Sequence, residues 1–134
     1  MKRIGFILIL AISIFQLTGC GCERKEESKP KQDDIKTAPE DVIQDQTVGI
    51  FTFKNTSLVY DGIESTLETV VTNTSDKDEK LVEFKITLIK DKETIAELIG
   101  FVGSTLKANE SKTITTSTSK DITMATEIVY EVIK

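Results

Sequence analysis

Thiol chemistry is available at only two positions of the chain, Cys20 and Cys22, and a deprotonated thiol is a strong nucleophile and metal ligand. A single residue separates them, so a disulfide between them would close no useful loop. Both also precede the segment that we expect to fold. The sequence therefore predicts a domain without disulfides, in which Cys22 is a solvated linker residue.

Other catalytic groups are scarce, because the 134 residues include no histidine and no tryptophan. Histidine is the commonest general base and the commonest side-chain metal ligand. Hydroxyl groups are dense between Ser111 and Ser119. No histidine is present to activate them, and alternation places Lys112 and Lys120 at the surface. We therefore interpret residues 111–118 as an exposed strand.

Carboxylates are the remaining candidates for chemistry. Asp76, Asp78 and Glu79 share one turn and offer oxygen ligands to calcium, but the turn lacks the glycine and the further ligands of a calcium loop. The carboxylates that a glycosidase would need are expected on the polar faces of strands, at Glu64, Glu68 and Glu83. The sequence predicts no enzyme, no metal site and no cofactor.

The N-terminus has the pattern of an export signal. Lys2 and Arg3 precede an apolar run from Ile4 to Phe15, broken only by Gly5 and one serine. A membrane-spanning helix needs roughly 20 apolar residues, and this run is shorter. We therefore interpret residues 1–19 as a signal peptide rather than a transmembrane anchor.

The signal ends in Leu17-Thr18-Gly19-Cys20, which resembles the lipobox of bacterial lipoproteins. The resemblance implies that the Cys20 thiol receives a diacylglycerol and that the chain is cleaved between Gly19 and Cys20. Two acyl chains, at about 0.8 kcal/mol per buried methylene, anchor a protein stably where one chain binds only marginally. The expected location is the extracytoplasmic face of the cell membrane.

Net charge argues against a nucleic-acid partner. The chain carries −5, and removal of the signal peptide with Lys2 and Arg3 takes this to −7. A protein that neutralises phosphates needs a clustered basic face.

A tether is expected between the anchor and the domain. Residues 20–46 are polar and charged, include Pro30 and Pro39, and hold few large aliphatic side chains. Such a segment buries too little apolar surface to offset its ordering entropy, so the sequence predicts a disordered stalk. A short helix over residues 39–46, with Pro39 in its first turn, is the alternative.

Beyond residue 46 the apolar residues recur with a period of two, which is typical of half-buried strands. The alternation is clearest in residues 82–88, and it also predicts that Ile95, Ile99 and Phe101 share the buried face of one strand. Turn residues divide the segment into about seven strands, over approximately 48–54, 57–60, 63–73, 80–90, 94–102, 111–118 and 125–133. The expected fold of residues 47–134 is an all-β, immunoglobulin-like antiparallel sandwich, with a small barrel as the alternative.

Three stretches of this domain resemble a family of extracytoplasmic bacterial domains that is named for its FxLYD motif and occurs in small lipoproteins. They are Ser57-Leu58-Val59-Tyr60-Asp61, Leu67 to Asn73, and Leu106 to Ser111. Thr69 stands where the family usually has glycine. The resemblance implies an immunoglobulin-like sandwich and no known enzymatic activity.

The expected function is that of a non-catalytic interaction or structural module of the cell envelope, with a membrane contact through its lipid and an envelope protein or cell-wall partner. Its binding surface is a sheet face, the loops at one end, or an edge strand such as 111–118. The alternatives are a solute-binding lipoprotein that serves a transporter and an enzyme inhibitor.

Overall fold

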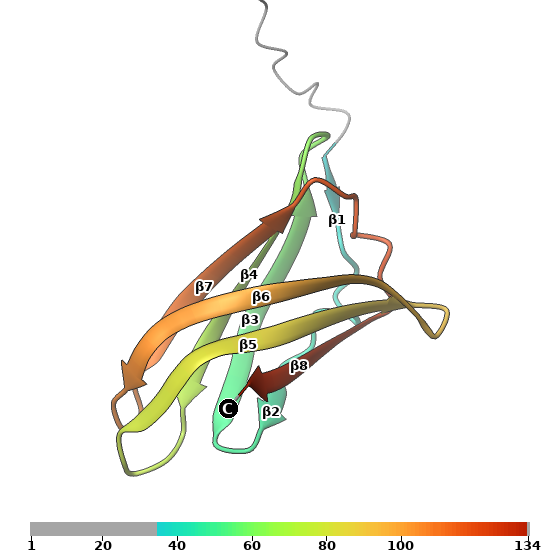
Figure 1. Ribbon diagram of the computed structural model, residues 1–134. Coiled ribbons are helices and arrows are strands. Elements are labelled where there is room, and N and C mark those ends of the chain that lie inside the picture. The colour runs from blue at the N-terminus through green and yellow to red at the C-terminus, as the bar shows by residue number, and fades with distance from the viewer. Residues whose placement is uncertain (1–34, 134) are drawn as a thin grey trace, which may run out of the picture.

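A computed structural model describes residues 35–133 of the chain (Figure 1). The predicted signal peptide, the cleavage site at Gly19 and Cys20, and Cys22 lie outside these residues.

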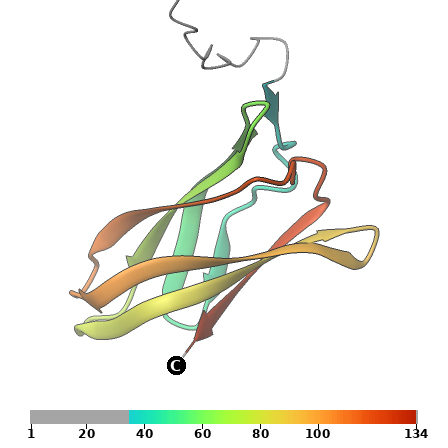
Figure 2. The same cartoon turned by 45° about the horizontal axis from the view of Figure 1, so that its top comes forward.

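Two antiparallel sheets pack face to face, and the described residues contain no helix (Figures 1 and 2). The five-stranded sheet has the order β1-β3-β4-β7, with β2 also paired to β3, and the three-stranded sheet has the order β6-β5-β8. The predicted all-β antiparallel sandwich is therefore confirmed. The strands are β1 (Lys36–Thr37), β2 (Gln46–Val48), β3 (Phe51–Tyr60), β4 (Ser65–Asn73), β5 (Glu79–Lys90), β6 (Glu93–Leu106), β7 (Ser111–Thr118) and β8 (Glu127–Ile133).

The predicted break between strands 48–54 and 57–60 is wrong, because residues 51–60 form the single strand β3. The expected strand 94–102 also continues to Leu106 in β6. Asn55 takes a left-handed φ of 52°, and the β3–β4 register shifts between Lys54 and Ser57. A bulge of this kind absorbs extra residues without ending the strand. The turn lies earlier, at Gly49 and Ile50, where β2 folds back onto β3.

The prediction of a tether as far as residue 46 is also wrong for its last part. β1 pairs with the end of β3, and Ala38 and Val42 are buried in the core. The Ala38 amide donates to Leu58 O, and the Val42 amide donates to Pro39 O in a turn rather than a helix. This segment is polar in its average composition. The burial of Ala38 and Val42 and the pairing of β1 with β3 are nevertheless enough to fix its conformation. The folded domain therefore includes the residues from Lys36 onward.

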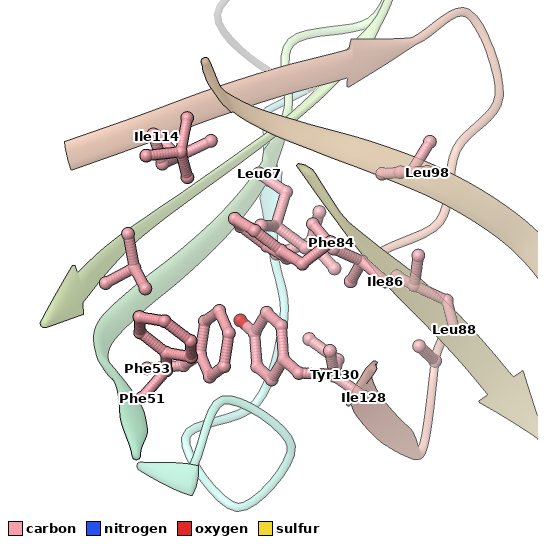
Figure 3. Packing of buried hydrophobic residues seen from close by; sticks show 14 of the residues in the cluster. Phe51, Phe53, Leu67, Phe84, Ile86, Leu88, Leu98, Ile114, Ile128 and Tyr130 are labelled. Atoms are coloured by element: carbon pink, nitrogen blue, oxygen red, sulfur yellow. The ribbon is translucent and has the colours of Figure 1, made fainter. Parts of the chain in front are cut away.

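The centre of the core is an aromatic cluster that joins the sheets (Figure 3). The rings of Phe53 and Tyr130 stack with centroids 4.3 Å apart, and Phe84 packs against Phe53 at 4.8 Å. Such pairs contribute about 0.5–1.5 kcal/mol beyond the burial of their area. Phe84 has room because Gly100 lies opposite it in β6. A Cβ on Gly100 would lie 2.3 Å from Phe84 Cζ.

Asn73 connects the two sheets at the opposite end from β1. Its side-chain amide is fully buried and donates to the carbonyl oxygens of Lys77, Leu106 and Lys107, while its Oδ1 accepts from the Ser75 amide. Asn73 ends β4, and Leu106 ends β6. The amide therefore satisfies backbone groups where strands of both sheets end, which is a structural role.

Candidate functional site

The two outer faces of the sandwich differ in chemistry. On the five-stranded sheet, the outward residues of β4 and β7 are mostly hydroxylated, with Thr66 opposite Ser117 and Thr72 opposite Ser111. The Thr72 and Ser111 hydroxyls lie 2.7 Å apart. Threonine-rich outer positions are typical of a solvated strand surface.

The outer face of the three-stranded sheet instead carries large apolar side chains. Phe84, Ile86 and Leu88 of β5 point into the core, so the intervening residues of β5 and their partners point outward. Phe101 and Ile99 of β6 are 67% and 47% exposed. On β8, Val129 and Ile133 are also exposed. We call Phe101, Ile99, Val129 and Ile133 the apolar outer face.

Strand pairing brings these four residues into neighbouring rows across β5. Phe101 and Ile133 both pair with Glu83, Ile99 pairs with Lys85, and Val129 pairs with Thr87. Facing residues on paired strands have Cβ atoms about 4.5–5.5 Å apart. The apolar outer face therefore comes from β6 and β8, and the outward residues Glu83, Lys85 and Thr87 of β5 lie between its two halves.

Lys85 lies at the centre of this surface. Its Nζ is 2.9 Å from Glu131 Oε2 and 3.8 Å from Glu97 Oε1. The hydrogen bond to Glu131 and the attraction of both carboxylates raise the pKa of Lys85 above its usual value. Glu83 lies on the same face of β5, so three carboxylates and one ammonium group share this surface. The surface thus combines apolar side chains with a net negative charge.

Phe101 is held against backbone despite its exposure. A Cβ added to Gly103, which has a φ of 76°, would lie 2.8 Å from Phe101 Cε1. Glycine at 103 therefore permits both the left-handed backbone and the close approach of the ring. One edge of the Phe101 ring packs against the backbone at Gly103, and the rest of the ring is exposed to solvent.

A groove of about 550 Å³ opens beside this surface, between the C-terminal end of β8 and the β2–β3 turn. Val48, Ile50 and Phe51 line one wall, and Val132 and Ile133 line the other. Glu79, Lys80 and Glu131 complete the lining. β8 is an edge strand, and the Gln46 side chain donates to Ile128 O near its start.

The carboxylates considered from the sequence do not assemble into one site. Glu68 lies on β4 in one sheet and Glu83 on β5 in the other, while Glu64 lies in the β3–β4 turn. Asp78 Oδ1 accepts a hydrogen bond from the Ala108 amide. Within residues 35–133 no three His, Cys, Asp or Glu side chains are grouped so that they would hold a metal ion.

The apolar outer face itself was missed, because Ile99 and Phe101 were expected to be buried. The buried residues of β6 are Leu98, Val102 and Leu106, and Gly100 also faces inward against Phe84. β6 is apolar on both of its faces. This pattern in the sequence could have indicated that one apolar face of the strand is exposed. Lys112 is exposed, as the sequence predicts, and its ammonium group donates to Val102 O across the edge of the sandwich.

No helix in the described part of the chain is long and apolar enough to cross a membrane. Comparison of the chain with protein-family models, with curated proteins and with solved structures gives no significant match.

Proposed function

We propose that this protein is a lipid-anchored, extracytoplasmic interaction module that binds an envelope protein through the apolar outer face and performs no reaction of its own. The observation that carries the proposal is the exposure of Phe101 and Ile99 beside Val129 and Ile133. Clustered apolar side chains rimmed by charge are typical of protein interaction sites. Aromatic residues in such clusters often contribute most of the binding free energy.

The contrast between the two outer faces supports the choice of surface. Both are outer faces of the same sandwich, and the fold requires only that their side chains tolerate contact with water. The outward residues of β4 and β7 on one face are mostly serine and threonine, while the other face exposes a phenylalanine and three branched aliphatic residues. A requirement for folding alone does not account for this difference, whereas a partner does.

The position of the surface fits an anchored protein. The proposed lipid at Cys20 precedes β1 in sequence, and β1 lies at one end of the sandwich, while the C-terminal end of β8 lies toward the other (Figures 1 and 2). Ile133 ends β8, and Phe101 pairs with the same residue of β5. A partner would therefore approach the side of the domain away from the anchored strand. The resemblance to FxLYD domains implies no known enzymatic activity, which agrees with a non-catalytic role.

The test is cross-linking on intact cells followed by mass spectrometry of the purified protein. We expect the wild-type chain to recover one envelope protein, and Phe101→Ser to lower its yield at least about fivefold. Ile63→Ser is the matched control, because Ile63 is 56% exposed in the β3–β4 turn, outside the apolar outer face. An undiminished yield with Phe101→Ser would overturn the assignment of this surface. Recovery of no partner above the Cys20→Ala form would favour a small-molecule or cell-wall ligand instead.

A further inference from the structure

We propose that β8 accepts an added β-strand whose residues alternate between apolar and basic side chains. This inference rests on the proposed function, in that it assigns the chemistry and the binding mode of the protein partner. Three features of β8 support it: its unpaired edge, the groove at its C-terminal end and the charged side chains on its outward side.

The free edge of β8 is the first feature. Among the described strands β8 forms a backbone ladder only with β5, and near its start the Gln46 side chain of β2 donates to Ile128 O. The rest of β8, toward Ile133, has no second strand partner. The opposite side of the sandwich is different, since the short turn from Leu106 to Ser111 joins β6 to β7 and Lys112 donates to Val102 O there. An edge strand presents backbone donors and acceptors that a further strand can pair with. β8 is therefore the more open of these two sides.

The groove beside β8 is the second feature. A strand added to β8 would direct every second side chain toward the core side of the sheet. That side opens into the groove of about 550 Å³, whose walls are Val48, Ile50 and Phe51 on one side and Val132 on the other. These residues predict that the inward side chains of the added strand are aliphatic.

Charge on the outward side of β8 is the third feature. Glu127 and Glu131 point outward, where they alternate with Val129 and Ile133 of the apolar outer face. Glu131 and Glu97 both pair with the same ammonium group, that of Lys85. The outward side chains of an added strand would lie next to these carboxylates. Basic residues at these positions would complement the charge, whereas acidic residues would be repelled.

A second copy of this chain is a poor occupant by the same argument. Pairing of β8 with β8 of another copy would bring Glu127 and Glu131 of both chains onto one surface, and the chain has a net charge of −5. Like charges that face each other across strands are destabilising. The charge pattern instead selects a cationic partner of a different sequence.

The test uses the full-length chain in detergent and a fluorescent seven-residue peptide of alternating valine and lysine. We expect saturable binding, measured by anisotropy, and at least about tenfold weaker binding of the alternating valine–glutamate and serine–lysine peptides. Ile50→Ser in the groove, and Glu127→Gln with Glu131→Gln on the outer side, should each weaken binding severalfold. Ile63→Ser should leave it unchanged.

Two N-methylated forms of the peptide separate strand addition from binding to a charged surface. Methyl groups on alternate amides block one edge of the peptide, and the two forms block opposite edges. Strand addition predicts that one form loses binding and the other keeps it, with slower hydrogen exchange at the β8 amides. Equal binding of both forms, or of the serine–lysine peptide, would overturn the inference.

Failure here is distinct from failure of the proposed function. If no peptide binds while Phe101→Ser still loses the cross-linked protein, the apolar outer face binds its partner without strand addition. If the peptide binds as expected while cells yield no cross-linked protein, β8 accepts strands and the proposed function is wrong.

Discussion

The hydroxyl groups of Thr56 and Tyr130 lie 2.9 Å apart in the core and join β3 of one sheet to β8 of the other. Thr56 Oγ1 also lies 3.0 Å from Thr69 Oγ1, so three side chains form one buried chain of hydrogen bonds. Burial raises the pKa of Tyr130, and hydrogen bonds from both threonines oppose that rise. Because each hydroxyl can donate to the next, the network leaves none of these oxygens without a partner.

Removal of the end of this network at Tyr130 and removal of its middle at Thr56 should cost different amounts of stability. Tyr130→Phe leaves Thr56 bonded to Thr69, and we expect the free energy of unfolding to fall by about 0.5–1.5 kcal/mol. Thr56→Val leaves the buried Tyr130 hydroxyl without its partner, and we expect a loss of about 1–3 kcal/mol. Urea unfolding measures both. Equal costs would contradict the network. A raised folded pKa also means that stability from neutral Tyr130 is present below about pH 10 and is lost at higher pH.

Gly100→Ala should destabilise the domain through a steric clash with Phe84. The added Cβ would lie 2.3 Å from the ring, and we expect a loss of about 1–3 kcal/mol, typical of overpacking. Phe84→Leu, which shortens the side chain, should relieve the clash. A double-mutant cycle measured by urea unfolding should therefore give a favourable coupling energy between the two substitutions. Simple additivity would show that Gly100 is needed for another reason.

The sequence predicts the sandwich well because the strands of its core have one clearly apolar face. Residues 84–88 alternate strictly, so the period identifies both the strand and its buried side. β6 is different, since Leu98 and Val102 on one face and Ile99 and Phe101 on the other are all apolar. A period of two then identifies a strand but not which face is buried. The packing of Phe84 against Gly100 decides it.

The candidate site was unpredictable for the same reason. The apolar outer face is visible only after β6 is oriented, and the groove depends on β2, a strand within and just beyond the segment that was predicted to be a tether. A strand of three residues is too short to give a periodic signal. Its contribution comes from tertiary contacts such as the Gln46 bond to Ile128 O.

Asp121 should make the stability of the domain sensitive to acid. Lys36 Nζ lies 2.6 Å from Asp121 Oδ2, and this pair with the hydrogen bonds from Thr123 lowers the pKa of Asp121. A lowered folded pKa stabilises the protein above about pH 4, and that contribution is lost as the pH falls through the folded pKa. Lys36 is largely exposed, so the ion pair contributes at most about 1 kcal/mol.

The check compares wild type with Asp121→Asn by urea unfolding at pH 7 and pH 2.5. We expect the variant to be less stable at pH 7 and the difference to shrink as the pH falls toward 2.5, because protonation of the wild-type carboxyl removes its charge. A difference that stays constant with pH would show that the side chain acts through its shape and not its charge.

Lipid attachment is predicted at Cys20 and not at Cys22, although the two thiols are one residue apart. Only Cys20 follows the Leu17-Thr18-Gly19 pattern, and two acyl chains on it would hold the domain at the membrane. Cells fed radioactive palmitate should label the wild-type chain and Cys22→Ala equally, and should not label Cys20→Ala. Loss of the lipid should also reduce the binding of the protein to washed membranes. Label on Cys20→Ala at the wild-type level would contradict the anchor and, with it, the extracytoplasmic location from which the proposed function starts.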